Sequence, residues 1–174
     1  LFVVNHASDE EERVEIFDVG TGGALIHIES VGFDAMKSPN DVAAVGPRSF
    51  FVTNDRGYKT GFLSTLEAYF ALPFSSLAYY DGQTGSIAKS GLVYANGVAV
   101  SADGADVFVA ELLARRISVF ARDAKTGALT KKGAFAAPTA PDNIDVAPDG
   151  ALYVAGHSRI FEFLKHAEDE NAIA

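Results

Sequence analysis

Asparagine and aspartate side chains stand at the ends of several short apolar runs in the sequence, where they could bind a cation. The set comprises Asn54, Asp55, Asn96, Asp142 and Asn143. Calcium takes about six to eight oxygen ligands from carboxylates, amide carbonyls, backbone carbonyls and water. Each of these side chains, taken alone, could simply form a turn at a strand end. Taken together they offer several oxygens with a low formal charge, which would leave a bound cation strongly electrophilic.

Two histidines also stand at strand ends. His6 ends the run FVVNH, and His157 ends the similar run YVAGH. A neutral imidazole can accept a proton from water near neutral pH, so either residue could act as a general base. A histidine at such a position can equally be structural or exposed to solvent, and for His157 the alternatives are a substrate wall and a partner for Asp142.

These residues fall on a repeated pattern. Four runs superpose, at spacings of 49, 57 and 45 residues: FVVNH at 2–6, FVTND at 51–55, FVAEL at 108–112 and YVAGH at 153–157. Each is followed by a second strand-like run, the last of them at 159–163, and three are preceded by a lead-in run that begins at Asn40, Asn96 or Asn143. Such a repeat of short strands and turn glycines is typical of β-propeller blades.

The pattern therefore predicts an all-β fold. We expect residues 1–174 to form a single partial β-propeller domain, an incomplete ring of about three to four blades. The lead-in strand of each blade should lie innermost, so Asn96 and Asn143 should converge on the central channel. The two histidines should face the same mouth of that channel. Asn40 aligns with these asparagines as well.

One segment departs from the strand pattern. Residues 61–75 carry Phe62, Leu66, Tyr69, Phe70 and Phe74 at near-helical spacing. This spacing predicts a short helical insert. Its apolar side chains could pack on the blades, or they could form a lid that offers an apolar wall to a substrate or a lipid surface. In the second case Leu66, Tyr69 and Phe70 would contact the substrate.

Composition excludes several classes of function. The chain has 23 acidic and 14 basic residues and a formal net charge of −9, which argues against nucleic acid or an anionic membrane as a partner. It has no cysteine, so a disulfide or a thiolate zinc site within these residues is excluded. No apolar run in it is long enough to span a membrane. The sequence starts at Leu1, inside a strand-like run, so we expect a piece of a longer chain, and the lack of a signal peptide carries no information about its compartment.

The motifs resemble those of the paraoxonase/arylesterase family along nearly the whole chain. The matching segments are VVNH, PNDVAAVGP, TND, EAYFALPFSSLAYYDG, ANGVAVSADGADVFVAELLARRISVF and DNIDVAPDG. The resemblance implies the middle part of a six-bladed propeller that holds two calcium ions and hydrolyses aryl esters, lactones and some phosphotriesters. It also favours a secreted or membrane-associated protein.

The resemblance implies roles for individual residues. The catalytic calcium would be bound by Asn54, Asn96, Asp142 and Asn143, and the second, structural calcium by Asp55. His6 matches one member of a catalytic histidine pair. Tyr94 and Leu112 fall in the apolar substrate wall. Asn40 and Asp41 receive no ligand role and are expected to be structural.

The chain departs from the family pattern at several points. The other catalytic histidine and an acidic pair of calcium ligands would lie upstream of Leu1, so we expect these 174 residues alone to be inactive. Arg56 and Arg115 stand where the family often has histidines. Two alternatives to the hydrolase stay open, namely a non-catalytic, calcium-stabilised propeller that binds a partner and a gluconolactonase-like propeller with a single metal.

Overall fold

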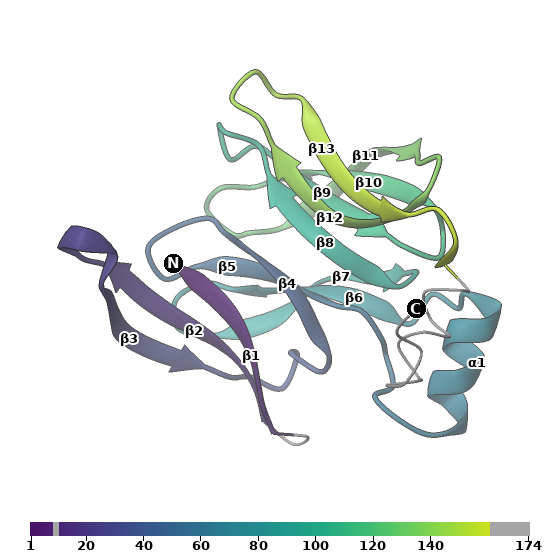
Figure 1. Ribbon diagram of the computed structural model, residues 1–174, viewed down its shortest axis with the longest axis horizontal. Coiled ribbons are helices and arrows are strands. Elements are labelled where there is room, and N and C mark those ends of the chain that lie inside the picture. Colours follow the sequence, from purple (N-terminus) through teal and green to yellow (C-terminus); the bar gives the residue numbers. More distant parts are fainter. Residues whose placement is uncertain (9–10, 161–174) are drawn as a thin grey trace.

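The strand-forming runs pair into four antiparallel sheets in the computed structural model, which describes residues 1–8 and 11–160 (Figure 1). The first sheet contains β1 (Phe2–Ser8), β2 (Glu11–Val19) and β3 (Leu25–Val31). The second contains β4 (Pro39–Ala44), β5 (Phe50–Asn54), β6 (Ser75–Tyr80) and β7 (Gly85–Leu92). The third contains β8 (Ala95–Val100), β9 (Asp106–Glu111), β10 (Arg116–Arg122) and β11 (Leu129–Ala136). The fourth contains β12 (Ala140–Val146) and β13 (Leu152–His157), and a 3-10 turn at Thr21–Gly23 joins β2 to β3.

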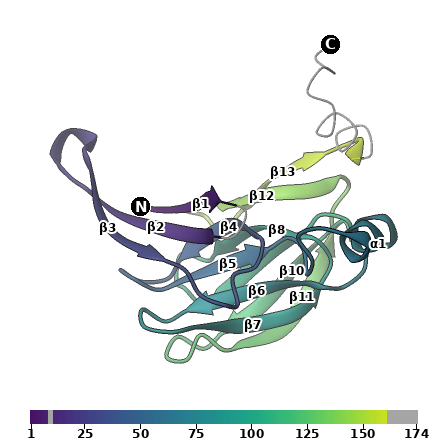
Figure 2. The same ribbon diagram turned by 90° about the horizontal axis from the view of Figure 1, so that it is seen from below.

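The sheets follow one another in chain order, and Figures 1 and 2 show the first and the last at opposite ends of the arrangement. The lead-in strands β4, β8 and β12 lie innermost, because β8 contacts both β4 and β12 across the gaps between sheets. Each sheet thus corresponds to one predicted blade, complete for the second and third sheets. The strand expected at 159–163 lies almost wholly outside the described residues.

The apolar side chains between neighbouring sheets hold this arrangement together. Phe50 and Phe51 are both fully buried, yet they belong to different clusters. Phe50 packs with Val14 and Tyr80 against the first sheet, and Phe51 packs with Phe120 against the third. Successive side chains of a strand point to opposite faces, so one strand contributes to the cores on both of its sides. The all-β prediction is confirmed.

The helical insert forms α1 (Phe62–Phe70), beside one rim of the sheets. Its orientation is unusual for an amphipathic helix, because the buried residues are polar. Glu67 is 2% exposed, and its carboxylate accepts hydrogen bonds from the backbone amides of Gly57 (2.9 Å) and Tyr58 (3.3 Å). This anchor fixes which side of the helix faces the protein. In the described part of the chain, no helix is both long and apolar enough to cross a membrane.

A second buried carboxylate ties the third sheet together. Glu111, at the end of β9, is fully buried and forms an ion pair with Arg116 at 2.7 Å. Its carboxylate also accepts hydrogen bonds from the Ser118 hydroxyl (2.5 Å) and the Val93 amide (2.9 Å). Burial alone would raise the pKa of Glu111, but these bonds outweigh it and the pKa is lowered. Glu111 therefore stays ionised and holds the turn before β8 in place.

Candidate active site at the inner strands

The three inner strands share one irregularity. On each of them, two residues lie opposite a single residue of the strand that is paired with it. The irregularity falls between Pro39 and Val42 on β4, between Ala95 and Val98 on β8, and between Pro141 and Ile144 on β12. These are β-bulges, which interrupt the hydrogen-bond ladder and redirect side chains, often next to active sites. The bulged residues are Asn40, Asp41, Asn96, Gly97, Asp142 and Asn143. The bulges therefore present asparagines and aspartates from three consecutive sheets at one level.

Close contacts join these bulges across the sheets. A Cβ added to Gly97 would lie 2.4 Å from the backbone oxygen of Asp142, so only glycine lets β8 approach β12 this closely. On the other side, the Val98 amide donates a hydrogen bond to Asp41 Oδ2 at 2.8 Å. The Thr53 hydroxyl donates to the backbone oxygen of Asn96 at 2.5 Å. The bulges of β4, β8 and β12 thus form one continuous surface.

Asn96 carries the clearest sign that these bulges could bind a cation. The residue is 6% exposed, and its side-chain oxygen is buried with no hydrogen-bond partner. A buried polar atom without a partner is costly, and such atoms often mark an ion or water site. Asn143 is exposed on the neighbouring bulge, and Asp142 is half-buried there. Amide and carboxylate oxygens of this kind suit calcium.

Two carboxylates near this surface are partly removed from solvent. Burial raises the pKa of Asp41, against the Val98 and Val42 amides that lower it, and the nearby charge of Asp142 raises it further. Burial also raises the pKa of Asp55, against a hydrogen bond from Ser38 and the charge of Arg56. Asn40 and His6 act on the pKa of Asp55 in the same direction as Arg56, so both lie close to it. A cation would offset the cost of burying these charges.

Asn54, by contrast, has all of its side-chain atoms engaged. Its oxygen accepts hydrogen bonds from the backbone amides of Lys37 (2.7 Å) and Ser38 (3.0 Å), and its nitrogen donates to Ala35 O and Ser76 Oγ. These partners lie on the loop before β4 and on β6, away from the inner strands. The role of Asn54 as a calcium ligand stays a prediction. To bind a cation, its oxygen would have to give up its two hydrogen bonds from backbone amides.

The two predicted histidines each pair with a carboxylate. His157 Nε2 lies 2.7 Å from Asp142 Oδ2, as expected if His157 is the partner of Asp142. His6 Nδ1 lies 2.6 Å from Glu12 Oε2, and the His6 side chain is 63% exposed. The charge of His6 also reaches Asp55, which follows β5. His157 therefore lies beside the bulge of β12, and His6 lies on the first sheet near Asp55.

The predicted substrate-wall residues divide into two groups. Tyr94 is half-buried, and its hydroxyl accepts a hydrogen bond from Arg56 Nη2 at 3.0 Å, whereas Leu112 is 3% exposed and belongs to the interior. On α1, Leu66 is half-buried, while Tyr69 is 78% and Phe70 is 70% exposed. Arg56 Nε is buried without a hydrogen-bond partner. The Arg115 side chain donates to Pro138 O.

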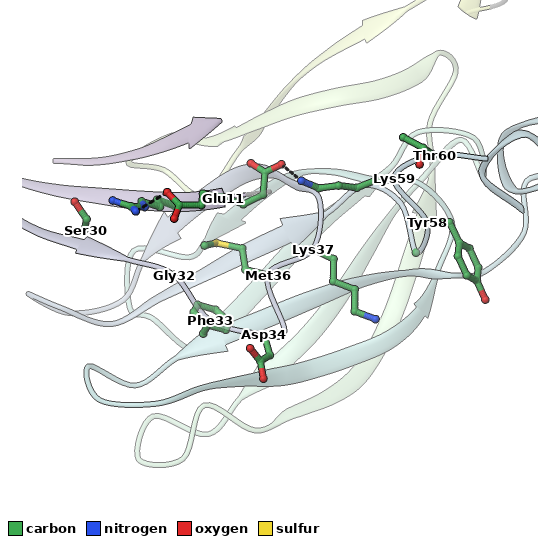
Figure 3. Close-up of a pocket in the computed structure, with 13 residues that line it drawn as sticks. Glu11, Ser30, Gly32, Phe33, Asp34, Met36, Lys37, Tyr58, Lys59 and Thr60 are labelled. Atoms are coloured by element: carbon green, nitrogen blue, oxygen red, sulfur yellow. Dashed lines mark hydrogen bonds and ion pairs between the residues drawn. The ribbon is translucent and has the colours of Figure 1, made fainter. Parts of the chain in front are cut away.

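A cavity of about 900 Å³ opens beside this site rather than within it (Figure 3). Its walls come from β2, from the connections before β4 and from the segment after β5, and they include Glu12, Met36, Lys37, Tyr58 and Lys59. None of the predicted site residues lines it. Glu12 nevertheless connects the two places, because it contacts both Lys59 in the cavity wall and His6.

Sequence reasoning gave Asn40 and Asp41 a structural role and did not single out Glu12, whereas the structure places all three close to the predicted site residues. A signal for Asn40 was present, because the lead-in repeat sets it in register with Asn96 and Asn143. Glu12 is the last residue of the acidic run at 9–12, and no sequence pattern placed it opposite His6. Among the residues that the structure describes, no group of three or more histidine, aspartate and glutamate side chains could hold a metal. A cation site here would therefore depend on amide oxygens as well.

Comparison with known proteins adds to this geometry. An arylesterase family model matches residues 1–172 of the chain. Serum paraoxonase/arylesterase 1 of Mus musculus is 36% identical over 159 residues, and the same protein of Homo sapiens is 35% identical. Serum paraoxonase/arylesterase 2 of Homo sapiens is 33% identical. Each match covers 90% of this chain and 44% of the relative, so the chain spans less than half the length of these relatives.

Solved structures resemble the fold more distantly. A luciferin-regenerating enzyme superposes with a TM-score of 0.57 at 22% identity, covering 85% of this chain and 49% of that one. The periplasmic gluconolactonase of Pseudomonas aeruginosa gives a TM-score of 0.56 at 16% identity, covering 89% of this chain and 47% of that one. At such identities the likeness concerns the fold alone, and it confirms the propeller architecture.

Proposed function

The chain belongs to the paraoxonase/arylesterase family, and from that premise we propose that the full-length protein is a calcium-dependent hydrolase of aryl esters and lactones, with phosphotriesters as further substrates. Family membership supports a hydrolase that acts on small molecules. The calcium and the choice of substrate belong to the proposal. The observation that carries the calcium is the buried, unpartnered oxygen of Asn96, at the bulge where β4, β8 and β12 meet.

We assign the cation to the bulged surface. Asn96, Asp142 and Asn143 would hold the catalytic calcium, and Asn40 occupies the equivalent position on β4. Asn54 remains a further predicted ligand of this ion, and Asp55 the predicted ligand of the second, structural one. When bound, calcium would make the substrate carbonyl or phosphoryl oxygen more electrophilic and favour the negative charge that develops on it.

The chain's own residues supply the proton transfer. His6 accepts a proton from the attacking water at the ring nitrogen that Glu12 does not occupy. His157 bonds to Asp142, and this bond would orient the carboxylate on β12. Arg56 and Tyr94 form a polar edge at the same mouth, where Arg56 Nε is a buried donor without a hydrogen-bond partner, 4.0 Å from Asp55 Oδ2. That donor suits a polar or anionic group on the substrate.

Chelation tests this proposal directly in the full-length protein. Hydrolysis of phenyl acetate and of a δ-lactone should fall to the background rate in excess EGTA, because no cation then favours the developing negative charge. Added calcium should restore the rate, and magnesium should not, since it demands a smaller octahedral site. Activity that is indifferent to EGTA would overturn the calcium assignment.

Arg56 also favours the non-catalytic alternative, a calcium-stabilised propeller that binds a partner at the same mouth. A combined measurement of calcium binding and turnover distinguishes the hydrolase from this non-catalytic alternative. A binding module would take up calcium and show no turnover with any ester or lactone, whereas the hydrolase would show both. The single-metal, gluconolactonase-like alternative differs in stoichiometry, because isothermal titration should then give one calcium ion per protein instead of two.

A lipid surface is a further proposed contact, through residues 61–75. Phe62, Tyr69 and Phe70 are each at least 70% exposed on α1, because Glu67 occupies the side that faces the protein. Exposed aromatic residues of this kind insert at membrane interfaces. The full-length protein should co-sediment with neutral phosphatidylcholine vesicles, and replacing Phe62 and Phe70 with serine should abolish this. Equal sedimentation of the variant would contradict the contact and would leave the hydrolase proposal intact. A secreted or membrane-associated location is proposed as well, on the basis of the family resemblance.

A further inference from the structure

His6 and Glu12 face each other across the first sheet. The register of β1 and β2 sets them directly opposite, so their side chains leave the same face of the sheet. His6 Nδ1 and Glu12 Oε2 lie 2.6 Å apart, a short distance typical of a charge-assisted hydrogen bond. Because the His6 side chain is 63% exposed, packing does little to fix its ring. The carboxylate is the contact that does so.

Glu12 is itself held from the other side. Its side chain is 11% exposed, and its second oxygen, Oε1, lies 2.5 Å from Lys59 Nζ. Lys59 lies on the segment after β5, in the wall of the cavity (Figure 3). Burial would raise the pKa of Glu12, but the hydrogen bonds from Lys59 and His6 outweigh it and lower the pKa. The carboxylate therefore stays ionised, with one oxygen for each partner.

This arrangement fixes the tautomer of His6. A carboxylate accepts hydrogen bonds and cannot donate them when ionised, so the proton of the neutral ring lies on Nδ1. The other nitrogen, Nε2, then carries the lone pair that can accept a proton, and none of the described residues bonds to it. When Nε2 takes up a proton, the carboxylate also stabilises the positive ring that results.

We propose that Glu12 is the positioning residue of His6: it fixes the ring through Nδ1, is held in turn by Lys59, and leaves Nε2 as the base. This inference rests on the proposed hydrolase, because it assigns His6 the task of accepting a proton from water. It adds no chemical step. It predicts that removing the negative charge of Glu12 slows proton transfer without weakening substrate binding.

The test uses Glu12→Gln in the full-length protein, which keeps the side chain's size but lets it donate to the ring. We expect kcat for phenyl acetate to fall about 10- to 100-fold with KM unchanged. The nitrogen-15 shifts of the His6 ring should show a proton on Nδ1 in the natural protein and a mixture of both tautomers in Glu12→Gln. Lys59→Met should shift both readouts in the same direction by a smaller factor, since it loosens Glu12.

The matched control is Glu29→Gln. Glu29, on β3, forms an ion pair with Arg48 in the connection between β4 and β5, so this change removes the same charge from the first sheet and breaks an ion pair away from His6. It should leave kcat and the His6 tautomer unchanged.

Two results distinguish the positioning role of Glu12 from the proposed hydrolase activity on which it rests. If Glu12→Gln keeps the natural kcat and the Nδ1 proton, the positioning role is overturned, while loss of activity in His6→Gln would still support the hydrolase. If His6→Gln has full activity, the assignment of His6 as the base fails instead. The nitrogen-15 measurement needs no turnover, so an Nδ1-protonated ring that shifts in Glu12→Gln supports the contact even in an inactive protein.

Discussion

His6→Gln should lower kcat of the full-length protein about 100- to 10 000-fold for an aryl ester, because glutamine keeps the shape of the side chain but cannot accept a proton at this pH. Calcium affinity should stay the same, since His6 pairs with Glu12 and stands outside the bulged surface. The stability of the fold should change little as well, because the side chain is 63% exposed.

The measurements are steady-state kinetics with phenyl acetate, a calcium titration by calorimetry and urea unfolding. His27→Gln serves as the control. His27 also pairs with a carboxylate, Glu15 at 2.8 Å, but it lies on β3 and has no contact with the bulges. A His6 variant that retains its natural kcat would remove His6 from the mechanism, and loss of calcium binding in it would show that the ring acts as a ligand.

Asn96→Ala should lower calcium affinity, whereas Asn54→Ala should lower the stability of the fold. The Asn96 oxygen has no partner within the protein, so its removal should lower calcium affinity at least about tenfold and leave the calcium-free fold nearly unchanged. Asn54 makes four hydrogen bonds from a fully buried position. Its removal should lower the free energy of unfolding by about 2–4 kcal/mol.

Calcium calorimetry and urea unfolding in EGTA measure the two quantities separately. Ser118→Ala is a useful reference, because it removes a buried side chain that makes one hydrogen bond and is not a predicted calcium ligand. Reduced calcium affinity in Asn54→Ala with an unchanged free energy of unfolding would establish Asn54 as a ligand. An unchanged calcium affinity in Asn96→Ala would show that the bulge of β8 does not bind the cation.

Much of the fold was predictable from the sequence, because propeller blades repeat and their strands are short and apolar. The runs at 2–6, 51–55, 108–112 and 153–157 became the equivalent strands β1, β5, β9 and β13. The lead-in runs became the inner strands. Local propensity and spacing were sufficient for this, since each prediction concerned residues that are neighbours in the chain.

The details of the site were harder to predict, because they depend on which residues oppose each other across strands. A bulge is defined by comparing two paired strands, so the extra residue at Asn40-Asp41 has no signature of its own. Periodicity indicated a helix at α1 but not that Glu67 would face the protein and leave Tyr69 and Phe70 in solvent. Glu12 could be assigned to His6 only from the register of β1 and β2.

The repeated bulge has a consequence for how blades that share one pattern can differ. Below it, each inner strand is held by its ladder partners and by side chains of the interblade cores, where substitutions act on stability. At the bulge, one inserted residue per blade has no partner in that ladder. The three bulges differ in residue type, with Asn-Asp at 40–41, Asn-Gly at 96–97 and Asp-Asn at 142–143, although the strands around them follow one pattern. Of these positions, Gly97 has to stay glycine, because a Cβ there would meet the backbone of Asp142. Three blades built on one pattern thus present different polar side chains at the level where their inner strands meet.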